Sequence, residues 1–321
     1  MKRRGRNIAS VMIVVCLALC IGMFSGALAQ DGQDGYTISN ITNRDKDQNA
    51  VTNIYYFDGA VWICTEGGVL KYSGGWTRYT TEQGLPGNLV TSMTMDADGG
   101  LWFGTVDGLA RYDGSWKTYK SKDGLPSDTV YDVIEAADGT IWVGTKGGIA
   151  RFNGTKWVQI GVGEEVLTPI ITRIVKDQVG DLWLGTYTMG VGVVTGGMWE
   201  IIDRDDGLPA NLISAIAFAP DGEVWIGTSK GLARYKGGSV KDVFTVKNEL
   251  LSNEVTSVLI DHEGSVWVGT WGGGVAVYDG REWTLITAAD GIVDDRVTAI
   301  AEDGDGTIWI GCWGGISRLT R

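Results

Sequence analysis

Histidine is almost absent from this chain of 321 residues, which contains only His262. A single histidine excludes zinc sites built from several histidines, and the sequence gives no sign of the nearby serine that a Ser-His-Asp triad would need. Proline occurs five times and cysteine four times. Outside the first thirty residues, no run places apolar residues at i, i+3, i+4 and i+7. The sequence therefore indicates no amphipathic helix beyond that point.

Basic residues are also scarce, with 27 Lys and Arg against 39 Asp and Glu and a net charge of −12. Residues 1–29 carry four of the basic residues and no acidic ones, so their removal would leave a net charge of −16. A chain this acidic is a poor candidate for binding nucleic acid, whose phosphates require a basic face. An acidic surface favours solubility and repels anionic partners.

The N-terminus has the order of a secretory signal peptide. A basic segment at residues 2–6 precedes an apolar run from Ile8 to Leu28, which ends in Ala27-Leu28-Ala29. We expect cleavage after Ala29 and a periplasmic or secreted protein. The alternative is an uncleaved N-terminal membrane anchor, because the apolar run is long for a signal peptide.

A repeat of 40 to 42 residues organises the rest of the chain. Its marker is a tryptophan that recurs seven times, at Trp62, Trp102, Trp142, Trp183, Trp225, Trp267 and Trp309, and that is followed two residues later by glycine in every copy except the first, where Cys64 takes its place. A fixed period of this size indicates a repeat architecture. If each copy forms a sheet with neighbouring sheets on both of its faces, these tryptophans and glycines pack between sheets. We therefore interpret them as scaffold rather than as ligand contacts.

One copy shows how the repeat folds. Residues 90–95, 101–105, 109–112 and 116–119 have the composition of short strands, and Asp-Gly and Gly-Leu-Pro sequences separate them. Turn-forming sequences at this spacing are typical of a meandering antiparallel sheet. Four strands in about forty residues describe a propeller blade. The sequence therefore predicts an all-β fold, a seven-bladed β-propeller of four-stranded antiparallel blades.

The seventh copy lacks a fourth strand, and residues 36–40 are left over at the other end. We predict that this N-terminal strand joins the last blade and closes the ring, which leaves no exposed ring-end edge. The expected organisation is a signal peptide at 1–29, a short flexible segment at 30–35 and a single propeller at 36–321. We expect it to act as a monomer.

Several copies resemble the two-component regulator propeller repeat. The resemblance rests on residues 98–105, Gly108-Leu109-Ala110-Arg111-Tyr112 and the following Asp123-Gly124-Leu125-Pro126. It implies a periplasmic sensor propeller of the kind often found ahead of a membrane span and a histidine kinase, many of which are implicated in sensing oligosaccharides. Because the sequence ends with the last blade, we expect any signalling to pass through a separate membrane sensor protein.

Residues that differ between copies are the candidates for ligand binding. The position after the Gly-Thr pair holds Glu66, Val106, Lys146, Tyr187, Ser229, Trp271 and Trp313 in blade order. Blade construction does not require an aromatic residue there. We therefore predict a ligand-binding face with Trp271, Trp313 and Tyr187 as stacking groups and with Glu66 and Lys146 as polar groups. The alternative is that each aromatic side chain packs sideways over its neighbour's loop.

Two other features break the repeat. Asp132 and Arg173 occupy positions expected to face the central channel on neighbouring blades, where they could contact a ligand or form an ion pair. The exit of the third blade, residues 161–169, lacks Gly-Leu-Pro and is acidic at Glu164 and Glu165. It could shape one side of the channel mouth, although a solvated acidic loop is the simpler interpretation.

Cys64 and Cys312 lie in the first and seventh copies, which become neighbours when the ring closes. The alternation of strand faces predicts that the two thiols either meet across the seam or both point away from it. Export makes a disulfide possible, but packed sheets lie about 10 Å apart and a bridge needs Cα atoms within about 7 Å.

The remaining candidate for chemistry is His262, in a turn on the face opposite the aromatic loops. The Asp303-Gly304-Asp305-Gly306 turn lacks the spaced ligands of a calcium loop, and we expect no metal and no cofactor. The leading hypothesis is a non-enzymatic recognition module for a small polar ligand, such as an oligosaccharide, or for a partner signalling protein. The alternatives are a protein-protein interaction scaffold and a propeller lyase or hydrolase. The enzyme alternative would require a His-Glu pair at the channel mouth.

Overall fold

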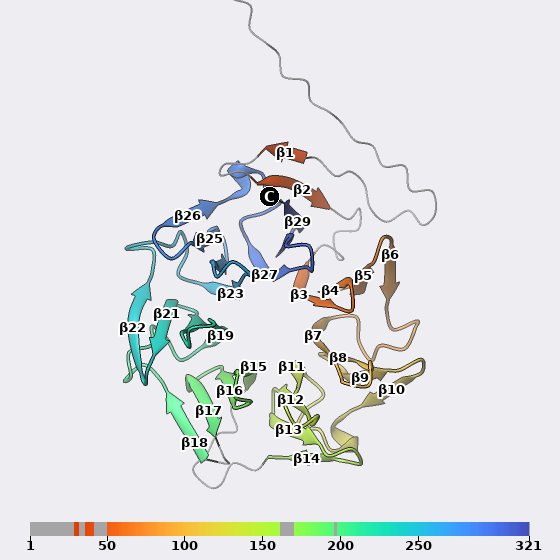
Figure 1. Cartoon of the computed structure of the whole chain (residues 1–321). Coiled ribbons are helices and arrows are strands. Elements are labelled where there is room, and N and C mark those ends of the chain that lie inside the picture. The colour runs from red at the N-terminus through yellow and green to blue at the C-terminus, as the bar shows by residue number, and fades with distance from the viewer. Residues whose placement is uncertain (1–28, 32–35, 42–49, 161–169, 196–197, 321) are drawn as a thin grey trace, which may run out of the picture.

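Seven antiparallel sheets stand around a central axis like the blades of a propeller (Figure 1). The computed structural model describes residues 29–31, 36–41, 50–160, 170–195 and 198–320. Apart from two 3-10 turns at Ser121–Asp123 and Ala288–Asp290, the regular structure of these residues is entirely β. The predicted seven-bladed β-propeller is confirmed. Residues 1–28 of the signal peptide expected at 1–29 and the acidic loop at 161–169 lie outside the described residues.

Each blade is a meander in which the first strand is innermost, and the first four blades follow the chain in order. Blade one consists of β3 (Val51–Phe57), β4 (Ala60–Thr65), β5 (Gly68–Tyr72) and β6 (Trp76–Tyr79). Blade two consists of β7 (Val90–Met95), β8 (Leu101–Thr105), β9 (Gly108–Tyr112) and β10 (Trp116–Tyr119). Blade three consists of β11 (Val130–Glu135), β12 (Ile141–Thr145), β13 (Gly148–Phe152) and β14 (Trp157–Gln159). Blade four consists of β15 (Ile171–Lys176), β16 (Leu182–Thr186), β17 (Val191–Thr195) and β18 (Met198–Ile202).

The remaining three blades continue the same pattern until the last. Blade five consists of β19 (Ile213–Phe218), β20 (Val224–Thr228), β21 (Gly231–Lys236) and β22 (Ser239–Phe244). Blade six consists of β23 (Val255–Ile260), β24 (Val266–Thr270), β25 (Gly274–Tyr278) and β26 (Trp283–Ile286). Blade seven consists of β27 (Val297–Glu302), β28 (Ile308–Cys312), β29 (Gly315–Thr320) and the N-terminal strand β2 (Thr37–Ile41).

The ring closes as predicted, because β2 pairs antiparallel with β29 from Thr37↔Thr320 to Ile41↔Ile316. A feature that the sequence did not predict lies outside this pair. Strand β1 (Ala29–Asp31) pairs with β2 and gives blade seven a fifth strand. Residues 30 and 31 of the stretch expected to be a flexible segment therefore lie in a strand, and residues 32–35 lie outside the described part.

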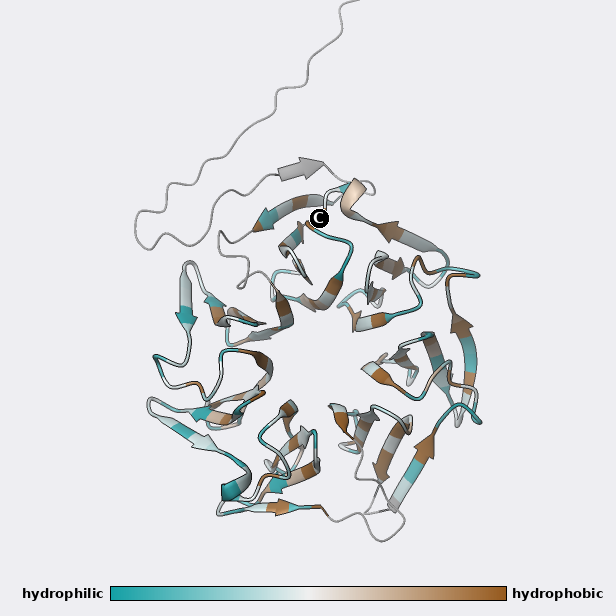
Figure 2. Ribbon diagram, turned by 180° about the vertical axis from the view of Figure 1, so that it is seen from behind, coloured by the Kyte–Doolittle hydropathy of each residue, from teal (hydrophilic) through white to brown (hydrophobic). Residues whose placement is uncertain are grey.

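The repeat tryptophans pack each blade on the next one. Trp102 is 2 % exposed and lies against Val133 and Val143 of blade three. Its indole Nε1 donates to Asp96 Oδ2 at 2.8 Å, and the same bond joins Trp267 to Asp261 and Trp309 to Asp303. Figure 2 shows hydrophobic residues concentrated in the strands and hydrophilic residues in the connections. The tryptophan motif is therefore blade scaffold, as interpreted from the sequence.

The motif glycine is required by close packing. A Cβ at Gly144 would lie 2.6 Å from Ile171 Cγ2 of the next blade, and one at Gly227 would lie 2.6 Å from Val255 Cγ1. Such distances are too short for real contacts, so at these blades the innermost strand of the following blade can approach only over a glycine.

Side-chain hydroxyls also join successive innermost strands. Threonine or serine Oγ atoms of one blade donate to a carbonyl at the start of the next, in the pairs Thr52–Val90, Thr91–Val130, Thr172–Ile213, Ser214–Val255 and Thr256–Val297. The inner strands have a free edge toward the channel, and these bonds satisfy carbonyl groups there.

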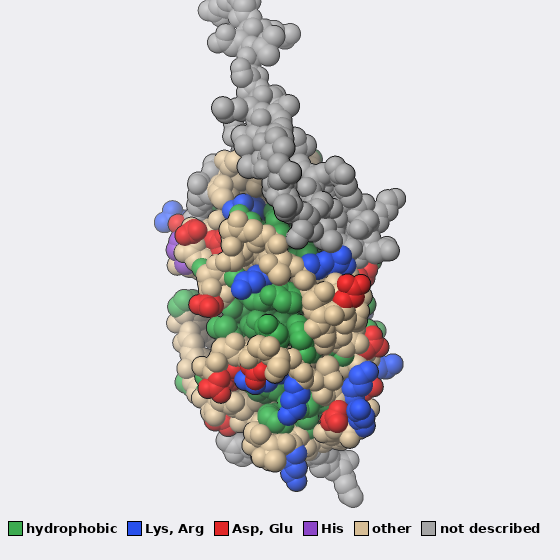
Figure 3. Space-filling model, turned by 90° about the vertical axis from the view of Figure 1, so that its right-hand side faces the viewer, with side chains coloured by type: hydrophobic (Ala, Val, Ile, Leu, Met, Phe, Trp, Pro, Cys, Tyr) green, Lys and Arg blue, Asp and Glu red, His purple; other side chains and the backbone are tan. Residues whose placement is uncertain are grey.

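The disc rim is mixed in character. Figure 3 looks onto the rim on the side of blades one and two, where hydrophobic side chains gather in the middle of the surface and charged side chains surround them. Partly buried rings from the outer strands of these blades contact each other, including Tyr79 and Trp116 with centroids 6.2 Å apart.

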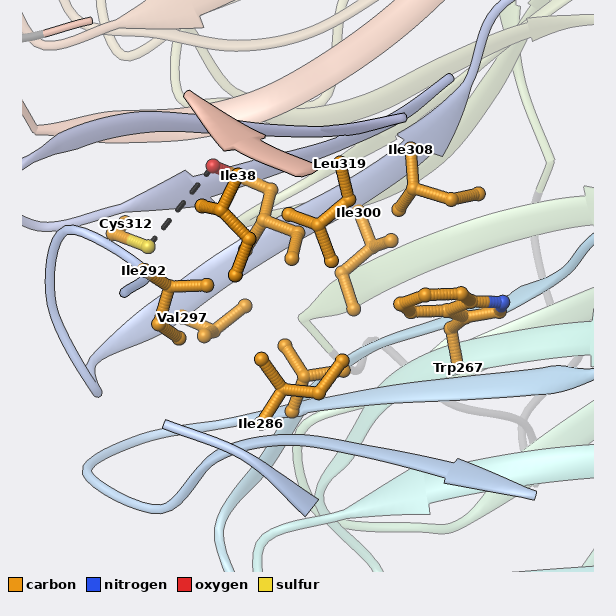
Figure 4. Close-up of a cluster of buried hydrophobic side chains, with 11 residues drawn as sticks. Ile38, Trp267, Ile286, Ile292, Val297, Ile300, Ile308, Cys312 and Leu319 are labelled. Atoms are coloured by element: carbon orange, nitrogen blue, oxygen red, sulfur yellow. Dashed lines mark hydrogen bonds between the residues drawn. The ribbon is translucent and has the colours of Figure 1, made fainter. Parts of the chain in front are cut away.

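The two cysteines of the propeller are free and buried. Cys64 packs with Phe103 of blade two, and Cys312 packs on the opposite side of its blade with Ile38 and Ile292 (Figure 4). Between them, the seam of blades seven and one is filled by a separate cluster that includes Trp309 and Ile63. The thiols therefore point away from the seam, and no disulfide joins them. Burial raises the pKa of Cys312 to about 12, so this thiol stays protonated.

Candidate functional site

One backbone hydrogen bond places the seven variable residues in equivalent positions. In every blade, the N–H of the residue after the Gly-Thr position donates to the carbonyl of the residue just before or at the start of the innermost strand. Trp271 N–H donates to Glu254 O at 2.9 Å, and Trp313 N–H donates to Arg296 O at 2.9 Å. The backbone is thus constant while the side chain is free to vary. We call the side of the disc that carries these residues the loop face.

Trp271 and Trp313 meet on the loop face of blades six and seven. Their ring centroids are 5.6 Å apart at an interplanar angle of 79°, an edge-to-face contact. They remain 37 % and 42 % exposed, whereas the motif tryptophans Trp267 and Trp309 are at most 1 % exposed. The two aromatic side chains are therefore both packed against each other and open to solvent, and we call them the tryptophan pair.

Arg296 connects the two tryptophans. It forms an isolated β-bridge with Trp271, and its guanidinium carbon lies 5.8 Å from the ring centroid of Trp313. Its Nε donates to Asp294 Oδ1 at 2.9 Å, and its Nη2 donates to Asp294 Oδ2. Hydrogen bonding to Arg296 lowers the pKa of Asp294, so this carboxylate is ionised over the physiological range.

Further groups extend the surface around the tryptophan pair. Ser252 Oγ donates to Trp271 O at 2.9 Å, next to Leu251, which is 51 % exposed. Asp295 Oδ1 accepts the backbone N–H of Ala288 at 2.6 Å, and its carbonyl accepts N–H groups of the glycine turn after Trp271. Glu254 is exposed beside them. The surface thus combines two large aromatic rings with one guanidinium and several carboxylates.

The other predicted site residues are not part of this cluster. Tyr187 is 51 % exposed on blade four, and within the described part of the chain no ring contact joins it to the tryptophan pair. Glu66 on blade one and Lys146 on blade three are exposed on the same face. Five predicted residues therefore share one face, but the structure brings only Trp271 and Trp313 into contact.

Asp132 and Arg173 correct the prediction for the channel. No ion pair joins them among the residues that the structure describes, and Asp132 is only 6 % exposed. Its Oδ1 accepts the N–H of Val133 at 2.9 Å, and its Oδ2 reaches sideways to accept the N–H of Ile174 in blade four at 2.8 Å. Arg173 Nη1 donates to Thr172 O at 3.1 Å. Asp132 therefore links blades three and four through a hydrogen bond from the backbone of blade four to its side chain.

Burial raises the pKa of Asp132 to about 6, although the charge of Arg173 and the two backbone N–H groups oppose this shift. The folded pKa lies above the unfolded value of about 3.9, so protonation stabilises the fold. That contribution is present at pH 4 and is lost as pH rises through about 6.

We therefore expect acidification from pH 7.5 to pH 4 to add roughly 2 kcal/mol to the free energy of unfolding through this group. Asp132→Ala should lose this gain, and the fold accepts alanine at the equivalent positions Ala215 and Ala299. Urea unfolding across this pH range measures the effect. Identical pH profiles for the two proteins would contradict it.

His262 does pair with a glutamate, but on the turn face. Its ring Nδ1 contacts Glu302 Oε1, and its backbone N–H donates to Glu302 Oε2 at 2.9 Å. The pair joins the turn after β23 to the end of β27, on the side of the disc opposite the tryptophan pair. The predicted position of His262 in a turn is therefore observed. In the described part of the chain, no cluster of three or more His, Cys, Asp or Glu side chains could hold a metal ion.

Sequence reasoning missed Arg296, Asp294 and Leu251. The sequence of the connection that leads into each blade could have indicated them. This connection is Gly84-Leu85-Pro86 before blade two and Gly207-Leu208-Pro209 before blade five. Before blades six and seven, Leu251 and Val293 replace the proline. The two blades that carry the tryptophans therefore both depart from Gly-Leu-Pro, as does the connection before blade four, the blade that carries Tyr187.

Comparison with known sequences shows which repeat this is. The sequence model described as "Two component regulator propeller" matches residues 84–107, 124–147, 207–230, 249–272 and 291–314. Five segments of this chain are two-component regulator propeller repeats. The five matched segments end just after the second strands of blades two, three, five, six and seven. Among curated proteins, none matches the sequence.

Solved structures similar to this propeller include a lyase and extracellular sensor domains. A streptogramin B lyase has a TM-score of 0.73 at 14 % identity, with 89 % of this chain and 97 % of that chain covered. The extracellular domain of a protein described as a hybrid two component system of B. thetaiotaomicron has a TM-score of 0.60 at 16 % identity, with 90 % and 55 % covered. At these identities the likeness shows the fold alone.

A third similar structure is the extracellular domain of a one component system of B. thetaiotaomicron, with a TM-score of 0.61 at 17 % identity and 96 % and 52 % covered. The propeller thus spans about half the length of the two sensor structures. Among its described residues, no helix is long and apolar enough to cross a membrane.

Proposed function

We propose that this propeller is an exported, non-enzymatic recognition module that binds a small polar ligand, such as an oligosaccharide, at the tryptophan pair. The observation that carries the proposal is the edge-to-face contact of Trp271 and Trp313 at 37 % and 42 % exposure, in a chain where six of the seven motif tryptophans are buried. An exposed indole ring stacks on the apolar face of a sugar, and nearby polar groups bind its hydroxyls.

The surroundings of the pair supply those polar groups. Arg296 Nη1 and the indole Nε1 atoms of both tryptophans have no hydrogen-bond partner within the described residues, so this small surface carries three donors that a ligand could use. The carboxylates of Asp294 and Glu254 provide acceptors. Alternating donors and acceptors beside an aromatic ring suit a ligand rich in hydroxyl groups.

The extracellular sensor domains with the same fold support an exported location and a role in sensing, and in that role a separate membrane protein would be the signalling partner. Catalysis is not part of the proposal. The chain has only one histidine, and His262 lies on the turn face, away from the tryptophan pair.

A glycan array followed by a thermal-shift titration tests the proposal. We expect a neutral oligosaccharide to bind the wild-type protein and the double variant Trp271→Ala/Trp313→Ala to bind it at least tenfold more weakly. Tyr56→Ala is the matched control, because Tyr56 has a similar exposure of 39 % and lies at the turn face. A ligand that binds the double variant unchanged would show that the site is elsewhere, and the absence of any glycan ligand would contradict the proposal.

A further inference from the structure

Arg296 is the positively charged group closest to the tryptophan pair. The carboxylate of Asp294 already neutralises its charge. Asp294 holds it through two bonds, with Oδ1 accepting Nε at 2.9 Å and Oδ2 accepting Nη2. The backbone N–H of Arg296 also donates to Asp294 Oδ1, at 2.8 Å. The carboxylate side chain is 18 % exposed and the guanidinium 44 %, so the pair sits at the surface with the arginine outermost.

The ion pair with Asp294 affects ligand choice, because an arginine side chain without such a partner binds carboxylates and sulfates strongly. A guanidinium presents a planar fork that binds a carboxylate through two parallel hydrogen bonds. Asp294 uses the Nε and Nη2 side of that fork. An anionic ligand can therefore use this edge of the fork only if Asp294 is displaced, and at the remaining Nη1–Nη2 edge it meets a guanidinium whose charge Asp294 already balances.

Two further acidic residues lie near the pair. Glu254 is exposed next to Trp271, and Asp295 lies between Asp294 and Arg296 in the sequence. Asp295 keeps one carboxylate oxygen on Ala288 N–H, and within the described part of the chain neither Asp295 nor Glu254 forms an ion pair. An approaching anion would meet repulsion rather than a receptor.

We propose that Asp294 is a specificity-determining residue that masks Arg296, so that the tryptophan pair selects uncharged oligosaccharides over those that carry uronate or sulfate groups. This inference rests on the proposed function and deepens it. The stacking rings provide affinity for the sugar, the masked guanidinium keeps Nη1 and the second N–H of Nη2 for hydroxyl groups, and the carboxylates exclude acidic ligands.

The fold allows a clean test, because other blades carry small residues where blade seven has Asp294. The equivalent positions are Gly87, Ser127, Ala210 and Ser252. Asp294→Ala therefore keeps a residue type that the repeat already uses at Ala210. It unmasks Arg296 and removes one negative charge. Asp294→Ala/Arg296→Ala is the matched control, since it removes the same negative charge together with the guanidinium.

Binding of three matched pairs of probes decides the question: linear hexamers of glucose, mannose and galactose, and the hexamers of the corresponding uronates. We expect the wild-type protein to bind at least one neutral hexamer at least tenfold more tightly than its uronate at low salt. In Asp294→Ala, the preference should fall by about fivefold or more, as expected for one unmasked charge contact in water. The double variant should not gain uronate binding, and added salt should reduce the differences.

The outcomes separate this inference from the function on which it rests. Equal or tighter binding of uronates by the wild-type protein would overturn the masking role while leaving the sugar site intact. So would an unchanged preference in Asp294→Ala. Failure of all six hexamers to bind, with or without the tryptophans, would overturn the proposed oligosaccharide site and the masking role together.

Discussion

Alanine in place of Trp309 is expected to lower the free energy of unfolding by about 3–5 kcal/mol, the range for a large aromatic side chain removed from a core. Trp309 is 1 % exposed and fills the seam between blades seven and one together with Val61 and Leu70. Its Nε1 donates to Asp303 Oδ2 at 2.8 Å, so the variant also leaves a carboxylate oxygen without its donor. Urea unfolding followed by tryptophan fluorescence measures the loss.

The matched control is Trp313→Ala, four residues further along the same chain segment. Trp313 is 42 % exposed, and its contacts are with Trp271 and Arg296 at the surface. We expect it to cost less than about 1 kcal/mol. Equal losses for the two variants would mean that scaffold and loop-face tryptophans have been wrongly distinguished.

Aspartate in place of Ile38 should have an effect of similar or larger size. Ile38 is 2 % exposed on β2 and packs in the core of blade seven with Leu319 and Trp267 (Figure 4). A carboxylate there would lose the apolar contacts and would have to be desolvated without a cation, a cost of roughly 4 kcal/mol or more. We expect the ring-closing strand to detach or the whole propeller to unfold, as measured by amide hydrogen exchange of β29.

Thr37→Asp is the control for this experiment, because Thr37 is the neighbouring residue on β2 and its side chain is exposed. It should leave the exchange of β29 nearly unchanged. If Ile38→Asp also leaves β29 protected, then β2 is not what holds the last blade in the ring.

The sequence predicted the scaffold well because the scaffold is periodic. Seven copies of a tryptophan, six of them with a glycine two residues later, impose the same packing on each blade, so the period alone set the number of sheets. The strand bounds at 90–95, 101–105 and 116–119 agree with β7, β8 and β10. The closing strand followed from the missing fourth strand of the last copy and from residues 36–40, which had no other role.

Side-chain direction was harder to predict, because it depends on packing across blades. Each innermost strand carries a register shift near its start, for example between Val130 and Asp132. Simple alternation placed Asp132 in the channel, whereas its carboxylate reaches the N–H of Ile174. The role of Arg296 depends on contacts between two connections far from each other in the repeat pattern. Comparison of the copies at one variable position does not reveal that Arg296 links Asp294 to Trp313.

The way in which the ring is closed also sets its mechanical behaviour. Thr37, where the chain enters β2, pairs with Thr320, where the chain leaves β29, so both ends of the propeller lie at the same end of one antiparallel pair. Tension applied between these two residues would load the backbone hydrogen bonds of the pair one after another, like a zipper, instead of all at once in shear. The seam is therefore weak against pulling from its ends even though its core is stable at rest, and blade seven would be the first to open under force.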